Sequence, residues 1–131
     1  LTAALEAAPR IVWAEGGSEV CVVAKGTATA CVAVDIALLP KPGPAALATA
    51  GSGDVLAGIM GSTLAKCGKS FEAENLPLLC ASACEVHGMA GALAAERFGS
   101  RGAMAGDIAN VVGLAIDELE ENVALMGGLG E

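Results

Sequence analysis

Two continuous runs of β-branched and small apolar residues, at 19–24 and 29–35, occupy the first third of the chain. A run without polar alternation is typical of a strand that is covered on both faces. The polar residues between the runs, 25–28, predict a short connection. Residues 1–8 have the character of the end of a helix, which we expect Pro9 to stop.

Apolar residues recur at helical spacing further along, after a proline-rich segment at 36–50 that is predicted to be a loop. The first of these helices is predicted over 53–66. The second is predicted over 75–98, because Pro77 is tolerated in the first turn of a helix but not in its interior. The last is predicted over 107–121, with an aspartate as its N-cap.

Small residues within the predicted helices suggest close packing. Gly58 and Gly61 would weaken an isolated helix, so we expect them to lie against a neighbouring element. A face of small residues on the 75–98 helix predicts the same: Ala81, Cys84, Gly88, Gly91 and Ala95. Two strands with three to four helices are too few for a complete doubly wound sheet. The pattern therefore predicts an α/β fold that is one part of a larger layered structure.

The composition fits one modest domain with an aliphatic core. The chain has 131 residues, of which 54% are hydrophobic and only 2% aromatic. Charged residues make up 17% of the chain, compared with roughly 25% in an average soluble domain. This deficit favours a surface that is partly covered by further chain or by other subunits, as in an oligomer.

The charge of the chain excludes some classes of partner. A net charge of −8 with only seven Lys and Arg argues against a protein that binds nucleic-acid phosphates. It does not exclude a nucleotide, because backbone N–H groups and a metal ion can hold one di- or triphosphate. The acidic residues at 117–121 are interpreted as a solvated helix face. The chain has no evident signal peptide or apolar span of about 18 residues, which predicts a cytoplasmic protein without membrane contact.

The number and spacing of the cysteines do not match a metal-binding motif. There are five, an odd number, and none form a Cys-x-x-Cys pair: Cys21, Cys31, Cys67, Cys80 and Cys84. Cys80 and Cys84 are four residues apart and so share a helix face, but no second ligand pair completes a zinc site. We expect all five to be buried, reduced thiols.

The most informative stretch is 48–58, Ala-Thr-Ala-Gly-Ser-Gly-Asp-Val-Leu-Ala-Gly. A small, flexible turn here leads directly into a predicted helix, whose N-terminus has unpaired N–H groups and the positive end of the macrodipole. Because glycine leaves the backbone accessible, Gly51, Ser52 and Gly53 are expected to form an anion hole for phosphate. Asp54 has two possible roles. It is either a base that takes a proton from the group with which the phosphate reacts, or an ordinary acidic residue in the first turn of a helix.

Three further residues are candidates for a site. Lys25, followed by Gly26, stands at the end of a predicted strand, where α/β proteins bind ligands, and it either meets a phosphate or leaves the sheet for water. His87 is the only histidine and is expected to be packed or at the surface rather than catalytic. Asp107 is expected to be a helix cap.

Several motifs together resemble the ADP/ATP-dependent NAD(P)H-hydrate dehydratases of the ribokinase-like fold. The stretch at 48–58 is the most specific, and Lys-Gly-Thr-Ala-Thr at 25–29 precedes it in the family's order. His-Gly-Met-Ala-Gly at 87–91 is similar to the family's His-Gly-x-Ala-Gly helix, and Gly-Asp-Ile at 106–108 is similar to its Ser-Asp-Ile. The chain departs from the family at 43–46, with Gly-Pro-Ala-Ala in place of Gly-Asn-Pro-Gly.

The resemblance implies a ribokinase-like three-layer sandwich. Residues 1–131 would be the C-terminal part of a single such domain, with about two strands and three to four helices, and the N-terminal half would be absent. The implied reaction repairs hydrated NAD(P)H: ADP or ATP, with Mg²⁺, phosphorylates the ring hydroxyl, and phosphate then leaves. A cytoplasmic homo-oligomer such as a tetramer is also implied.

The resemblance also assigns roles to residues. Asp54 would be catalytic and would contact the hydrated cofactor. The nucleotide would be bound by Lys25, Gly26, Thr27, Ala28, Thr29 and Gly53. Two alternatives stay open: a sugar or vitamin-precursor kinase of the same fold, which shares the anion hole and the base, and an inactive fragment or subunit that keeps the motif as structure.

Overall fold

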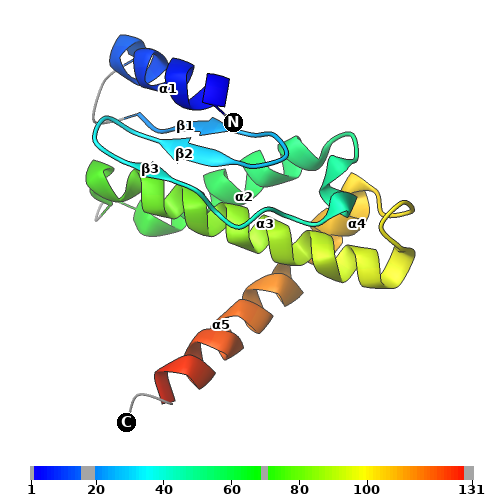
Figure 1. The fold of residues 1–131 in the computed structure, drawn as a ribbon. Helices are drawn as coiled ribbons and strands as arrows, with labels where there is room; N and C mark the ends of the chain where they lie inside the picture. Colours follow the sequence, from blue (N-terminus) through cyan, green and yellow to red (C-terminus); the bar gives the residue numbers. More distant parts are fainter. Residues whose placement is uncertain (1, 16–19, 69–70, 129–131) are drawn as a thin grey trace. The chain divides into compact units, whose positions relative to one another are not determined.

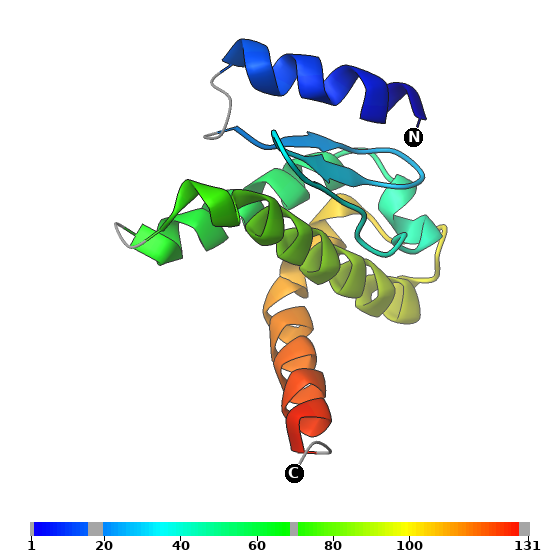
Figure 2. The same ribbon diagram turned by 60° about the vertical axis from the view of Figure 1, so that its left-hand side comes forward.

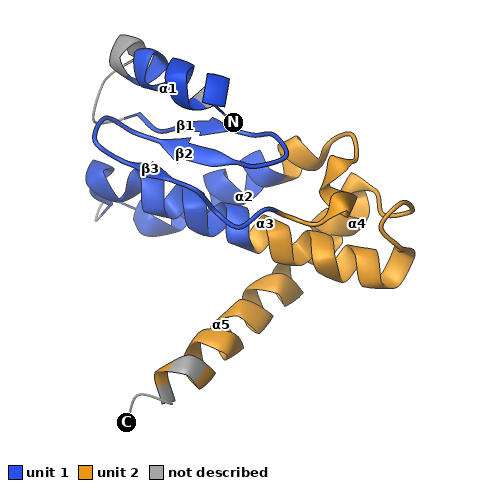
Figure 3. Ribbon diagram, in the orientation of Figure 1, with its two compact units in different colours: residues 1–42, 56–85 blue, residues 43–55, 86–131 orange. Residues whose placement is uncertain are grey.

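The chain's structure, a computed structural model, describes residues 2–15, 20–68 and 71–128. It divides into two compact units that are interleaved along the sequence (Figure 3). Unit 1 comprises residues 1–42 and 56–85, and unit 2 comprises residues 43–55 and 86–131.

Unit 1 is built on an antiparallel sheet with the strand order β1-β2-β3 in the described residues. The strands are β1 (Val22–Ala24), β2 (Ala30–Val32) and β3 (Ala37–Leu38). Val23 pairs with Cys31, which pairs with Leu38 on its other side. Helix α1 (Thr2–Glu15) covers one face of the sheet, and the unit 1 portions of α2 (Ser52–Cys67) and α3 (Leu76–Phe98) lie on the other face (Figures 1 and 2).

Helix α1 continues through Pro9, so the predicted end at this residue is wrong. Packing against the sheet explains the difference. Ala8 and Val12 are buried, and Ala8 contacts a cluster that includes Ala30 and Val32 of β2. Burial of a valine is worth about 1.5–3 kcal/mol, which is comparable with the ~3 kcal/mol that an interior proline costs.

The two predicted strands are confirmed in position but are shorter than expected. Strand β1 lies within 19–24, of which residue 19 is outside the described residues, and β2 lies within 29–35. Coverage on both faces holds for β2, which is fully buried, but not for β1, which is only half-buried. Strand β3 lies in the segment predicted to be a loop, because two residues are too short to leave a periodic signal.

Unit 2 contains an aliphatic core, as the composition predicts. It is formed by the second half of α3 with the 3₁₀ helix η2 (Ala45–Ala48), α4 (Ala105–Asn110) and α5 (Val112–Gly128). The buried residues of this core are Ala46, Ala90, Ala94, Ala103, Ile108, Val111 and Ala115.

The predicted helices at 53–66 and 75–98 are confirmed as α2 and α3. Pro77 lies in the first turn of α3, directly after the 3₁₀ helix η4 (Ala73–Asn75). The last predicted helix is wrong in its limits, because α4 and α5 replace it and the chain stays helical to Gly128. Asp107 is not an N-cap: Met104 holds that position, and Asp107 lies in the first turn of α4.

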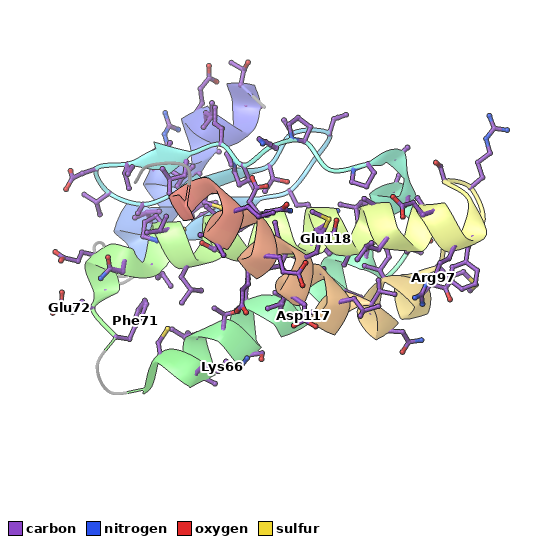
Figure 4. All side chains as sticks on the ribbon, turned by 90° about the horizontal axis from the view of Figure 1, so that it is seen from below. Lys66, Phe71, Glu72, Arg97, Asp117 and Glu118 are labelled. Carbon is purple, nitrogen blue, oxygen red and sulfur yellow. The ribbon has the colours of Figure 1, made fainter. Side chains whose placement is uncertain are left out.

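The glycines of α2 do not make the close contacts predicted for them. Gly58 and Gly61 are exposed, and a Cβ added to either would meet no described atom within 4 Å. The acidic face of α5 agrees with its interpretation, since Asp117 and Glu118 are solvent-exposed (Figure 4).

The segment Ala73–Phe98, which includes α3, is long and apolar enough to cross a membrane by length and composition, with a mean hydropathy of 1.4. The expectation that the chain has no such span is therefore wrong. Of the 18-residue apolar stretch within this segment, 44% is buried inside the structure. Ala90 and Ala94 belong to the core of unit 2. The core helix of a soluble protein passes the same test of length and composition.

Candidate active site

The Gly-Ser-Gly-Asp motif forms the N-terminus of α2, as the sequence predicts. The carbonyl oxygen of Gly51 accepts a bond from the Asp54 N–H at 3.1 Å, and the Ser52 N–H donates to the Thr49 carbonyl at 3.3 Å. Gly53 is the second residue of the helix, so its N–H has no acceptor within the helix. This N–H is therefore a first-turn donor at the positive end of α2.

The two glycines of the motif serve different purposes. Gly51 has a φ of +84°, in the left-handed region that side chains disfavour. A Cβ on Gly51 would also lie 3.1 Å from the Cβ of Ala105. Gly53 has no positive φ, and a Cβ there would meet nothing within 4 Å. The turn requires glycine at 51, whereas glycine at 53 leaves the helix end open to a ligand.

A buried hydrogen bond fixes the motif to α3. Ser52 and His87 are only 1% and 2% exposed, and Ser52 Oγ lies 3.2 Å from His87 Nε2. Which atom donates depends on the histidine tautomer. His87 is packed, which is one of the two positions expected for it, but no local pattern indicated its bond to the motif. The Ser52 side chain is therefore turned into the protein and is not available to a ligand.

The segment before the motif also packs closely on α3. A Cβ on the buried Gly91 would come within 2.5 Å of Leu47 Cδ2 and 3.1 Å of Pro44 Cγ. Glycine at this position lets the chain approach the helix just ahead of α2. The His-Gly-Met-Ala-Gly pattern thus has a structural reason: His87 holds Ser52, and Gly91, one turn later, makes room for Leu47.

The two aspartates highlighted by the sequence differ in their surroundings. Asp54 is exposed in the first turn of α2, where the helix dipole favours a carboxylate and a substrate can reach it. Asp107 is half-buried, and its Oδ2 accepts a hydrogen bond from the Met104 N–H at 2.9 Å. Asp107 is therefore not the N-cap that the sequence predicted, but its carboxylate caps the Met104 N–H from the third position of the helix.

Five of the six residues predicted to bind the nucleotide, 25–29, form the loop of the β1–β2 hairpin in unit 1, closed by the pairing of Ala24 with Ala30, whereas Gly53 lies in the first turn of α2. Lys25, Gly26 and Thr27 are exposed, and the two residues that follow are half-buried. Lys25 stands directly after β1, at a strand end as predicted. The structure thus groups the predicted residues into two sets, one on this hairpin and one at the N-terminus of α2 in unit 2.

A surface groove in unit 1 contains none of the predicted site residues. It runs along the end of α2 and the start of α3, and Figure 4 shows Phe71 and Glu72 on the segment that connects them. Its lining is formed by Thr63, Cys67, Phe71, Glu72, Asn75, Leu78, Leu79 and Ser82. In the described part of the chain, no group of three His, Cys, Asp or Glu is arranged to hold a metal ion.

Comparison with known proteins identifies the family. A family model described as NAD(P)H-hydrate dehydratase matches residues 12–112, which include the hairpin loop and the motif. The bifunctional NAD(P)H-hydrate repair enzyme Nnr of Escherichia coli (strain K12) is 38% identical over 105 residues. The match covers 79% of this chain and 19% of that enzyme, so the chain spans about a fifth of the relative's length. No solved structure gives a significant match. The chain belongs to the NAD(P)H-hydrate dehydratase family.

Proposed function

We propose that the chain carries part of the active site of an enzyme that restores hydrated NADH or NADPH, with ADP or ATP as phosphoryl donor. One observation supports this above all: residues 51–54 form an open helix N-terminus with an exposed carboxylate, inside the region that matches the family. In the reaction, the ring hydroxyl of the hydrate is converted to a phosphate ester. Phosphate then leaves in place of hydroxide, which is a much poorer leaving group, and the dihydropyridine is restored.

Asp54 acts as the general base in this proposal. Its exposure allows the ring hydroxyl to approach, and a carboxylate can accept the hydroxyl proton as the oxygen attacks the terminal phosphorus. The new O–P bond forms while the bond from phosphorus to the leaving nucleotide breaks. Since phosphoryl transfer depends on positioning and charge stabilisation, the base needs a fixed anion site beside it.

The N-terminus of α2 supplies this anion site. The Gly53 N–H lies in the first turn and stabilises the negative charge on the transferring phosphoryl group. The turn at Gly51 and Ser52 holds this donor in place, with the Ser52 N–H bonded to the Thr49 carbonyl. His87 is a positioning residue here, because its bond to Ser52 fixes the turn without reaching the substrate. The buried pair keeps the backbone donors in place before the substrate arrives.

The hairpin loop at 25–29 binds the nucleotide in this proposal. The Lys25 ammonium is exposed and can pair with phosphate, and the exposed Gly26 leaves the backbone accessible. Mg²⁺ usually binds through phosphate oxygens, water and one or two carboxylates. The ion would neutralise charge on the phosphates.

We further propose that the complete domain is a ribokinase-like three-layer sandwich, of which residues 1–131 are the C-terminal part. The helix, sheet and helix layers of unit 1 are compatible with it (Figure 2). Exposed apolar side chains on α5, such as Val123 and Leu125 at 70% and 69%, support a homo-oligomer such as a tetramer. A cytoplasmic location without nucleic-acid partners fits the acidic charge.

Substrate competition separates the proposed reaction from a kinase of the same fold. The protein is incubated with ADP or ATP and either hydrated NADH or a panel of sugars and vitamin-precursor alcohols. We expect nucleotide consumption only with the hydrate, and free phosphate as a product. Stable phosphorylation of a sugar or vitamin precursor, with no reaction of the hydrate, would overturn the proposal in favour of the kinase.

A further inference from the structure

Four of the five cysteines lie together in unit 1, between β1, β2 and α3, and are here named the thiol cluster: Cys21, Cys31, Cys80 and Cys84. The strand register accounts for two of them. Cys31 is paired with Val23, and Cys21 precedes Val23 by two residues, so both cysteines point to the same face of the sheet. Ala30 and Val32 alternate with them and contact α1 on the opposite face.

Helix α3 contributes the other two thiols. Cys80 and Cys84 are separated by one helical turn and therefore lie on one face of α3. Their side chains contact the strand cysteines in two pairs, with the Cys21 thiol donating to Cys80 and the Cys31 thiol donating to Cys84. All four are free in the structure. The expected reduced state is confirmed, but only Cys31 and Cys80 are buried as expected. Cys21 and Cys84 are half-buried, and Cys67, outside the cluster, is exposed.

The two members of each pair differ in acidity. The hydrogen bond from Cys31 lowers the pKa of Cys84; burial and the charges of Cys80 and Glu85 oppose this, and Lys25 adds to it. The same bond and burial raise the pKa of Cys31 above its ordinary range. Cys84 is therefore the more acidic thiol of its pair. Because the thiolate is the reactive form of cysteine, the more acidic Cys84 is the nucleophile of the pair.

Access favours the same pair. Cys84 is half-buried, whereas Cys80, the corresponding cysteine of the other pair, is only 6% exposed. Cys31 is fully buried, so a small oxidant from solvent does not reach its sulfur directly. The oxidant can reach the Cys84 sulfur, and Cys31 lies next to Cys84 to react with the oxidised product. This is the arrangement of an accessible cysteine with a resolving cysteine.

We propose that Cys84 and Cys31 form an oxidation site that hydrogen peroxide converts to a disulfide between α3 and β2. The Cys84 thiol gives up its proton, its sulfur attacks one peroxide oxygen, and the O–O bond breaks. The departing hydroxide takes up this proton as water, and Cys84 is left as a sulfenic acid. The Cys31 sulfur then attacks the Cys84 sulfur, the S–O bond breaks, and the hydroxide leaves with the Cys31 proton as a second water. Two thiols lose two electrons in total, and one peroxide is reduced to two waters.

A metal site is the competing interpretation of four clustered thiols. Tetrahedral Cys₄ zinc sites need all four sulfurs about 2.3 Å from one ion. The described residues contain no group of three ligands arranged for a metal, and these four cysteines are all among them. The observed arrangement is two contacting pairs, which favours disulfide chemistry.

The test uses the reduced protein with one equivalent of hydrogen peroxide. Free thiols are then counted by alkylation, and cross-linked peptides are mapped by mass spectrometry without reduction. We expect the thiol count to fall by two per chain, one Cys31–Cys84 peptide to form, and dithiothreitol to restore both thiols. Unchanged thiols at these positions, or a disulfide between Cys21 and Cys80 alone, would overturn the proposal.

Single variants separate the roles of the two sulfurs. Cys31→Ala should leave Cys84 as a sulfenic acid that dimedone traps, whereas Cys84→Ala should abolish both the cross-link and the trapping. Cys67→Ala is the matched control, because Cys67 is exposed and outside the cluster, and it should leave the intramolecular cross-link unchanged. If a variant of the thiol cluster does not fold, the peptide mapping of the oxidised, unsubstituted protein still shows whether the Cys31–Cys84 disulfide forms. Stoichiometric zinc in the purified protein, with thiols resistant to peroxide, would also overturn the proposal.

Discussion

Alanine substitution at the two glycines of the motif should have opposite effects on stability. In Gly51→Ala the new residue must keep a φ of +84°, and its Cβ must sit 3.1 Å from the Cβ of Ala105. In Gly53→Ala the Cβ meets nothing within 4 Å and the backbone is ordinary helix. The chemical change is the same in both variants, so each is the control for the other.

The magnitudes follow from the backbone and its neighbours. A non-glycine residue in the left-handed region costs about 1–2 kcal/mol, and the contact with Ala105 adds to this cost. Replacing glycine by alanine also restricts the unfolded chain, which stabilises the folded state by about 0.4–1 kcal/mol where the conformation is compatible. Gly51→Ala should therefore destabilise the protein by roughly 1–2 kcal/mol. Gly53→Ala should stabilise it by about 0.5 kcal/mol.

Urea unfolding followed by circular dichroism measures both values. The midpoint should fall for Gly51→Ala and rise slightly for Gly53→Ala, with the same m-value as the unsubstituted protein. Calorimetric titration with ADP and ATP then separates folding from binding. Gly53→Ala should bind nucleotide more weakly despite its stability, because the new methyl group lies at the open helix end. Equal effects of both substitutions on stability, or unchanged binding by Gly53→Ala, would refute this account of the motif.

Two further hydrogen bonds and the thiol cluster give predictions of the same kind. Ser52→Ala removes a buried partner of His87 and should destabilise the protein by about 1–3 kcal/mol in urea unfolding; a loss below about 0.5 kcal/mol would contradict the buried bond. Asp107→Ala should cost about 1 kcal/mol, because the Met104 N–H loses its cap, whereas Glu118→Ala on the exposed face of α5 should change little. Peroxide treatment of the reduced protein should raise its thermal midpoint reversibly, because the cross-link between β2 and α3 restricts the unfolded chain; an unchanged or lower midpoint would argue against an unstrained disulfide.

Local signals predicted much of the fold. The start of the helix at 75–98 was predictable because Pro77 fits only the first turn of a helix. The start of α2 was predictable because a Gly-Ser-Gly turn and an acid precede apolar residues at helical spacing. The end of α1 was not, because the burial that carries the helix past Pro9 depends on β2, which is distant in sequence. The short β3 and the break between α4 and α5 depend on tertiary packing in the same way.

The chemistry of the candidate site was predictable from the sequence, but the contacts that hold the site in place were not. The residues of the Gly-Ser-Gly-Asp motif indicate an anion site without any structure, because the preference of phosphate for helix N-termini is a local property. The bond between Ser52 and His87 joins residues 35 positions apart and leaves no mark on local periodicity. Gly91 illustrates the same limit, since its small size is explained only by Leu47 beside it.

The central claim is that Asp54 at the N-terminus of α2 is the base in the repair of hydrated NAD(P)H. The most direct measurement uses the complete domain that contains residues 1–131, either unsubstituted or as Asp54→Asn. It follows the absorbance of reduced nicotinamide after hydrated NADH is mixed with this protein and ADP or ATP. The account predicts recovery of absorbance with the unsubstituted protein, and no recovery with Asp54→Asn although it binds nucleotide with the same affinity. Recovery at an undiminished rate with Asp54→Asn, or none with the unsubstituted protein, would contradict it.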